Sequence, residues 1–149
     1  MLQQIRIDNW LVEVDLDQTR EFYSKDLEVC DCLYCKNYVE ATKSFNSSIS
    51  DLFSQLGILA SKPAELSYFS TDESGEMCYI GDFHLVGKVL EGELCTPSNF
   101  EETNTFKVEN FTFGFSEHLE FVPKRFPTPV LQFILVANIP WVLEENPED

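Results

Sequence analysis

The chain has 149 residues, and 26 acidic side chains against 10 basic ones give it a net charge of −16. This charge repels phosphate backbones and anionic lipid headgroups, so we expect no nucleic-acid binding and no binding to a membrane surface. The length, together with 13 Phe, 5 Tyr and 2 Trp, is sufficient for a hydrophobic core, so we expect a single globular domain over residues 1–149.

The sequence shows neither the pattern of a secretory signal nor that of a membrane span. The first residues lack the charged start and apolar run of a signal peptide. No stretch approaches the roughly 20 apolar residues that cross a bilayer. We therefore expect a cytoplasmic protein whose thiols stay reduced, and the odd count of five cysteines agrees with this.

The N-terminal part begins with a strand pattern and a short helix. Alternating apolar residues over 9–16 predict a half-buried strand, with one face formed by Trp10, Val12, Val14 and Leu16. A helix over 17–23 is predicted to follow, with Asp17 as its N-cap.

Two longer helical patterns come next. Asp31 is positioned to cap a helix that runs to about Phe45, because apolar residues recur there at helical spacing. Ser47 or Ser48 is positioned to cap a second helix over 48–56, and Gly57 is a natural C-terminal stop.

After Pro63 the pattern changes to strands. Residues 66–69 and 77–90 predict a hairpin around 71–76. Residues 106–115 predict a further strand, with a bulge or bend near Glu109 and Asn110 because its aromatic residues change parity. Residues 129–137 are apolar on both faces, as expected for an interior strand. The predicted class is α+β, an antiparallel sheet covered on one face by two or three helices from the N-terminal half.

The densest chemical signal is the motif C-x-C-x-x-C formed by Cys30, Cys32 and Cys35. Thiolates bind soft metals, and structural zinc takes four Cys or His ligands. The motif predicts a zinc site with three ligands from the cluster. The fourth ligand stays open in the sequence, and its candidates are Cys78, Cys95, His84 and His118.

The same cysteines allow two other interpretations. Cys32 and Cys35 stand near a predicted helix N-terminus, where a thiolate is favoured, so a redox protein or a cysteine-dependent enzyme is an alternative. The enzyme would need His84 or His118 beside one of these thiols, and the neighbouring Asp31 and Glu28 oppose thiolate formation. In the third interpretation, Cys30 and Cys35 are small core residues.

Our leading functional hypothesis is a non-enzymatic protein-interaction domain, of the immunity or inhibitor type, that binds a basic protein. The strong acidity and the absence of catalytic motifs from the sequence favour this class. The alternatives are a small zinc-binding domain organised by Cys30, Cys32 and Cys35, and a cysteine-dependent enzyme or redox protein. The sequence defines no oligomeric state.

Overall fold

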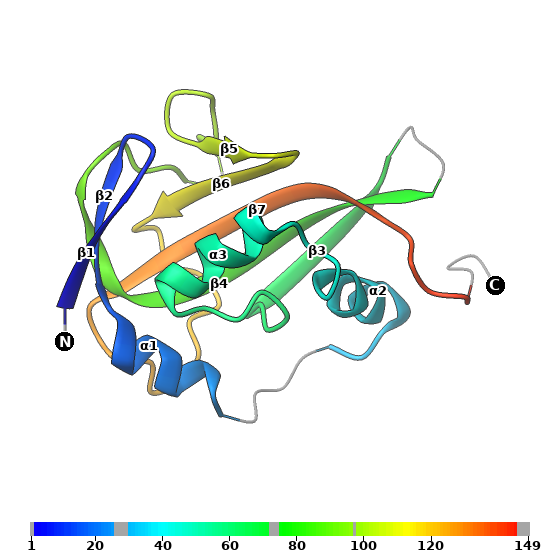
Figure 1. Ribbon diagram of the computed structural model, residues 1–149, viewed down its shortest axis with the longest axis horizontal. Helices are drawn as coiled ribbons and strands as arrows, with labels where there is room; N and C mark the ends of the chain where they lie inside the picture. Colours follow the sequence, from blue (N-terminus) through cyan, green and yellow to red (C-terminus); the bar gives the residue numbers. More distant parts are fainter. Residues whose placement is uncertain (1, 26–29, 72–74, 97, 146–149) are drawn as a thin grey trace.

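A computed structural model describes residues 2–25, 30–71, 75–96 and 98–145. Within these ranges there are three helices, α1 (Leu16–Tyr23), α2 (Leu33–Thr42) and α3 (Ser47–Leu56). The seven strands of the antiparallel sheet are β1 (Leu2–Ile7), β2 (Trp10–Asp15), β3 (Glu65–Ser70), β4 (Glu76–Glu91), β5 (Phe106–Val108), β6 (Phe111–Ser116) and β7 (Val130–Pro140). This confirms the predicted α+β class with its helices in the N-terminal half (Figure 1).

The longest strand, β4, organises the sheet. On one side it pairs with β7. On the other side it pairs first with β3 and then with β2. The order is β1-β2-β4-β7-β6-β5, with β3 also beside β4. Because β7 lies between β4 and β6, the interior position predicted for 129–137 is confirmed. The predicted hairpin is β3 and β4, although residues 72–74 of its turn lie outside the described ranges.

Helix α1 fills the gap that β3 and β2 leave along β4. The hydroxyl of Tyr23 donates to the carbonyl of His84 over 2.9 Å and accepts the N–H of the same residue over 3.1 Å. The hydroxyl of Thr19 accepts the N–H of Val86 over 3.0 Å. Unpaired buried backbone groups are costly, so these two side chains take the place of a neighbouring strand at this point.

The main core lies between the sheet and α3, with α2 beside it (Figure 1). The ring of Phe53 on α3 packs edge-on against Phe83, Phe113 and Phe133, at centroid distances of 5.2, 5.9 and 5.6 Å. These three rings belong to β4, β6 and β7, so one helical side chain ties three strands together. Gly57 follows α3 with φ 78, which confirms the predicted helix stop.

Loops cover part of the opposite face of the sheet and bury two polar side chains, those of His84 and Gln132. His84 and Gln132 are 0 % and 1 % exposed. The amide of Gln132 accepts the N–H of Glu120 over 2.7 Å and donates to Asp82 over 3.0 Å. His84 Nε2 lies 2.9 Å from the carbonyl oxygen of Glu120. This face therefore contains hydrogen-bonded polar side chains, whereas the helix-covered face is aromatic.

The predicted helix ends need correction. The observed N-caps, each of which accepts a helix N–H through its side chain, are Asp15, Cys32 and Asn46 in place of Asp17, Asp31 and Ser47 or Ser48. The cap is the last residue with extended backbone before the helix, and that position depends on where the preceding segment turns. Helix α2 also ends at Thr42, before Phe45, whose ring instead packs 5.0 Å from Phe111.

Residues 106–115 form two short strands joined by a tight turn at Glu109 and Asn110, the position at which the sequence predicted a bulge or bend within one strand. Phe106 on β5 pairs with Phe113 on β6, and Glu109 adopts φ 55 in the turn between them. Chain reversal brings an even-numbered and an odd-numbered aromatic residue onto the same face, which explains the change of parity.

Over the described residues, the helices have only 8 or 10 residues each, and none is long and apolar enough to cross a membrane.

Candidate metal centre

The cysteines of the C-x-C-x-x-C motif come together where α2 begins. Cys32 is the N-cap of the helix, and its Sγ accepts the N–H of Cys35 over 3.5 Å. The N–H of Cys32 in turn donates to the Sγ of Cys30 over 3.5 Å. The three Sγ atoms lie within 4.8 Å of one another. We call these three residues the cysteine cluster.

The dimensions of the cysteine cluster fit a zinc ion. A tetrahedral ion with Zn–S distances of about 2.3 Å holds its sulfurs about 3.8 Å apart. The sulfurs would therefore need to approach one another by at most about 1 Å. Cys30 has room for this movement because it is exposed and precedes the helix, whereas Cys35 is buried in the first turn of α2.

The cluster makes its thiols chemically unequal. Burial acts to raise the pKa of Cys32, but hydrogen bonds from the Cys35 backbone and from the Cys30 and Cys35 thiols outweigh it, so the pKa is lowered. Burial, followed by the hydrogen bonds and charges of Cys30 and Cys32, raises the pKa of Cys35. The cluster therefore favours ionisation of Cys32 and opposes ionisation of Cys35. Glu28, one of the two residues expected to oppose a thiolate, lies outside the described residues.

Hydrogen bonds between α2 and the sheet hold the cysteine cluster in place. The hydroxyl of Tyr79 on β4 donates to the carbonyl of Tyr34 over 2.7 Å. Asn37 donates to that hydroxyl over 3.2 Å, and its amide oxygen accepts the N–H of Val142 over 2.7 Å. Sequence reasoning missed these residues. The signal that could have found them is Asn37, a polar residue beside Tyr38 on the apolar face of a predicted helix.

Two of the predicted fourth ligands lie on the wrong face of the sheet. Tyr79 points toward α2, and Phe83 packs against α3. Successive side chains of a strand point to opposite faces, so Cys78 and His84 point away from the helices. The structure therefore does not bring either residue to the cysteine cluster.

The other two candidates also lie away from the cluster. The Sγ of Cys95 lies against Gly114, which points away from the helices because its neighbour Phe113 points toward them. His118 pairs with Glu120 over 3.0 Å. Over the part of the chain that the structure describes, the group able to hold a metal is the three cysteines alone, and it pairs no cysteine with a histidine.

The cysteines differ in how far they are buried, and burial affects both their pKa and their possible role in the core. Burial raises the pKa of Cys95 to about 11 and also raises the pKa of Cys78, so both remain neutral thiols near pH 7. Cys35 is 2 % exposed, in agreement with the core interpretation, but Cys30 is exposed and does not fit it. Core packing alone therefore does not explain the cysteine cluster.

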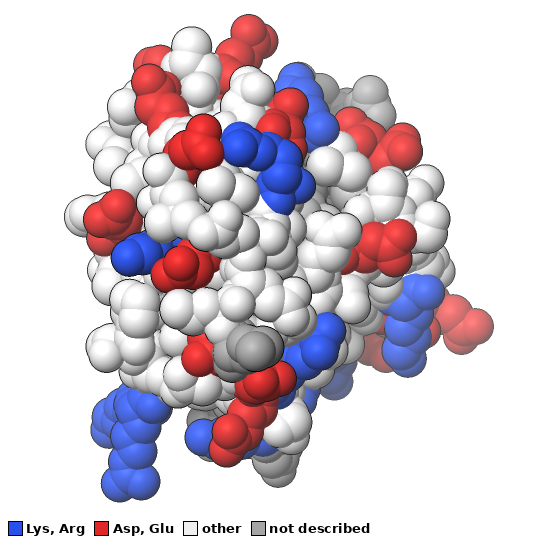
Figure 2. Space-filling model, turned by 60° about the vertical axis from the view of Figure 1, so that its left-hand side comes forward, with Lys and Arg blue, Asp and Glu red and all other residues white. Residues whose placement is uncertain are grey.

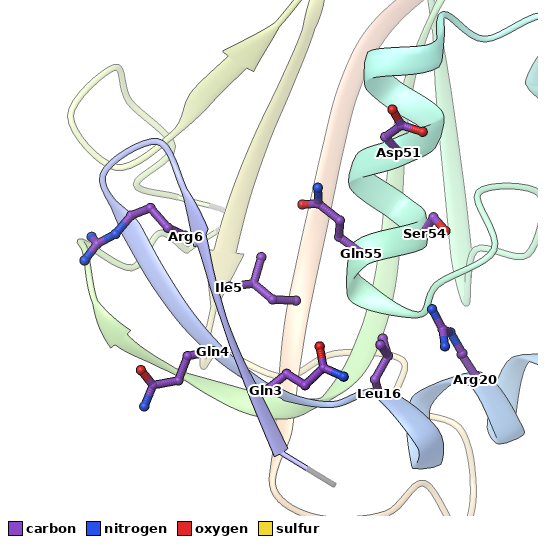
Figure 3. Close-up of a pocket in the computed structure, with 9 residues that line it drawn as sticks. All are labelled: Gln3, Gln4, Ile5, Arg6, Leu16, Arg20, Asp51, Ser54 and Gln55. Carbon is purple, nitrogen blue, oxygen red and sulfur yellow. The ribbon is translucent and has the colours of Figure 1, made fainter.

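A hollow of about 640 Å³ lies between β1, α1 and α3 (Figure 3). In Figure 1, β1 and α1 lie on the left of the molecule and α2, where the cysteine cluster stands, on the right. Its lining is mainly polar and contains Gln3, Gln4, Ile5, Arg6, Leu16, Arg20, Asp51, Ser54 and Gln55. Two guanidinium groups and one carboxylate give it no surplus of negative charge. It is therefore a poor match for the basic partner expected from the net charge.

The surface on this side of the molecule mixes both signs of charge. Figure 2 shows acidic and basic side chains interspersed with uncharged residues on the face brought forward from the left of Figure 1. Two opposite-charge pairs join strands of the sheet. Lys88 of β4 lies 4.0 Å from Glu13 of the neighbouring β2, and Arg6 of β1 reaches Glu91 of β4 across β2 at 3.2 Å. This face offers no continuous acidic patch for a basic protein.

Comparisons with known protein families, with curated proteins and with solved structures found no match to this chain.

Proposed function

We propose that this protein binds one zinc ion through the thiolates of Cys30, Cys32 and Cys35. The observation that carries the proposal is the approach of three Sγ atoms to within 4.8 Å of one another at the start of α2. Thiolate sulfur prefers zinc and other soft ions to calcium or magnesium, which take oxygen ligands. A cytoplasmic location, as expected from the sequence, would keep these thiols reduced and available.

The arrangement of hydrogen bonds supports a metal site. Two backbone N–H groups already point at the sulfurs of Cys30 and Cys32, and such donors stabilise a thiolate. Cys35 starts as a neutral thiol and would lose its proton on binding, because a coordinating thiol is deprotonated. Zinc binding should therefore release protons and weaken as pH falls.

The test is the metal content of protein purified under reducing conditions without chelator. We expect about one zinc per chain, as the donor set predicts. Cys32→Ser should lose most of the zinc, whereas Cys78→Ser is the matched control and should retain it. Absence of zinc from the wild-type protein, or equal retention in both variants, would contradict the proposal.

Thermal unfolding gives an independent measurement. A ligand at a hundred times its Kd stabilises the folded state by about 2.7 kcal/mol, which for a chain of this length corresponds to an increase in Tm of about 5–10 °C. We expect a chelator to remove this increase and added zinc to restore it. The same treatment should leave the Tm of Cys32→Ser unchanged.

The basic protein partner remains a proposal that rests on the net charge of −16. Neither the hollow of Figure 3 nor the face in Figure 2 adds support to it. We therefore place metal binding ahead of protein interaction as the function of this chain.

A further inference from the structure

The cysteine cluster supplies three ligands to an ion that takes four. Zinc in proteins is almost always tetrahedral, and sites with three protein ligands keep one position for a water molecule or another ligand. The described residues offer no fourth cysteine, histidine or carboxylate to this group. Of the two cysteines and two histidines elsewhere in those ranges, Cys78, His84 and Cys95 lie on the other face of the sheet. His118 pairs with Glu120.

Three aromatic rings lie next to the cysteine cluster, and we call Tyr34, Tyr68 and Trp141 the aromatic wall. The rings of Tyr34 on α2 and Tyr68 on β3 are stacked, with centroids 4.2 Å apart and planes 10° apart. The indole ring of Trp141 meets Tyr34 edge-on at 5.7 Å. Tyr68 is 40 % exposed, so solvent reaches this wall.

Tyr68 lies next to the start of α2 through its contact with Tyr34. Tyr34 stands between Cys32 and Cys35 in the first turn of the helix, and the ring of Tyr68 stacks on it. Tyr68 also pairs with Tyr79 on the neighbouring strand, and the hydroxyl of Tyr79 donates to the carbonyl of Tyr34. Because Cys30 is exposed on the same cluster, a molecule from solvent can approach the ion beside the tyrosine rings.

Resting on the proposed function, we propose that an exogenous thiolate occupies the fourth position of the zinc ion, supplied by a small-molecule thiol or by a cysteine of another protein. The incoming thiol loses its proton to solvent, its sulfur forms a bond to the ion, and a bound water molecule leaves. No atom is oxidised or reduced in this exchange.

Two observations favour a thiolate over water as the resident ligand. The three existing ligands are soft sulfurs, and a fourth sulfur completes the donor set of a common zinc site. Sulfur also makes favourable contacts with aromatic rings, and the stacked rings of Tyr34 and Tyr68 lie next to the cysteine cluster at the start of α2.

Charge further restricts the thiol. Three thiolates and one divalent ion leave one net negative charge at the site, within a chain of net charge −16. An anionic thiol such as glutathione is repelled, whereas an uncharged or cationic thiol is not. We therefore expect uncharged thiols to bind more tightly than glutathione, with a difference that shrinks as salt is added.

Cobalt substitution tests the inference on the whole protein. Cobalt(II) is titrated into reduced, metal-free protein and its visible spectrum recorded, and then 2-mercaptoethanol, glutathione or a lysine-flanked cysteine peptide is added. We expect 2-mercaptoethanol and the peptide to change the cobalt bands in a saturable way. Similar affinities for these two identify a small thiol as the source, and much tighter binding of the peptide identifies a protein cysteine.

Variants connect the effect to the aromatic wall. Tyr68→Ala should weaken thiol binding by about two- to tenfold, as expected from a lost sulfur–ring contact, and leave cobalt binding itself unchanged. Tyr68→Phe keeps the ring and should retain the affinity for thiols.

The results that would contradict the proposed function differ from those that would contradict only the fourth, exogenous ligand. If cobalt does not bind with a thiolate spectrum, the proposed function itself is wrong. If cobalt binds but no thiol changes its bands, only the present inference is wrong. If Glu28→Gln or Asp31→Asn changes the spectrum before any thiol is added, a carboxylate of this chain fills the fourth position and the inference is again overturned.

Discussion

The replacement of a missing strand by α1 can be tested with Tyr23→Phe. This substitution removes one oxygen atom and keeps the ring, which is 3 % exposed. That oxygen makes two hydrogen bonds to the backbone of His84, at 2.9 and 3.1 Å. After the substitution, a buried N–H and a buried carbonyl of β4 both lose their partner.

The expected loss of free energy of unfolding follows from the N–H and the carbonyl of His84. A buried polar group left unsatisfied costs about 1–3 kcal/mol, so Tyr23→Phe should lower the free energy of unfolding by about 2–5 kcal/mol. Tyr38→Phe is a matched control, because Tyr38 is also buried but makes a single hydrogen bond, to the carbonyl of Ala60 at 2.7 Å. Ala60 is partly exposed, so water can replace that donor, and we expect a loss of about 1 kcal/mol.

Urea unfolding followed by tryptophan fluorescence measures both losses. Hydrogen exchange adds a readout specific to this site, because the amide of His84 should exchange faster in Tyr23→Phe and keep its protection in Tyr38→Phe. If the two variants lose equal stability and the amide of His84 stays protected in both, Tyr23 does not replace a strand and the reasoning is refuted.

Three further predictions concern the core, a turn and pH. Ile134 is 5 % exposed and lies outside the main core, so Ile134→Ala should lower the free energy of unfolding by about 2–3 kcal/mol. Leu135 lies in the main core, so Leu135→Ala should lower it by about 3–5 kcal/mol. Urea midpoints that rank the two variants in reverse would contradict the assignment of these residues to the two faces of the sheet. Gly57→Ala should lose at least about 1–2 kcal/mol in the same assay, because φ is 78 and its Cβ would lie 3.1 Å from a leucine of α1. Burial lowers the pKa of His84 below 6.5, so its contribution to stability is present above that pH and is lost as the unfolded chain gains a proton below it. The loss of stability between about pH 7 and pH 5 should therefore be smaller in His84→Gln, and an unchanged loss would show that His84 does not titrate on unfolding.

The elements that could be predicted from the sequence are those that bury one regular face. Strand β2 buries alternate residues, as the pattern over 9–16 predicted, and α3 buries Ile49, Leu52, Phe53 and Leu56 at helical spacing. Strand β7 lies inside the sheet and is covered on both faces for most of its length, which explains its continuous apolar run. Burial of one face constrains the residue types, and that constraint is readable from the chain.

Strand β1 could not be predicted because this constraint is absent there. It is an edge strand, and of Leu2–Ile7 only the last residue is buried. Its pairing with β2 depends on backbone hydrogen bonds, which any sequence can make. The role of Tyr23 could not be predicted for a related reason, since it depends on where β3 stops and β2 starts along β4.

The candidate site divides in the same way into local and non-local parts. Cys30, Cys32 and Cys35 lie within six residues, and capping of one helix is enough to gather them, so the cluster was visible in the sequence. The identity of a fourth ligand depends instead on which face of β4 meets α2. A shift of β4 by one residue would turn Cys78 toward the helix and Tyr79 away from it. In the observed register Tyr79 points toward α2 and anchors it. Its neighbour Cys78 therefore points to the face of the sheet away from the helices. Among the described residues, the anchoring of the helix and the separation of Cys78 from the cysteine cluster are therefore consequences of the same strand register.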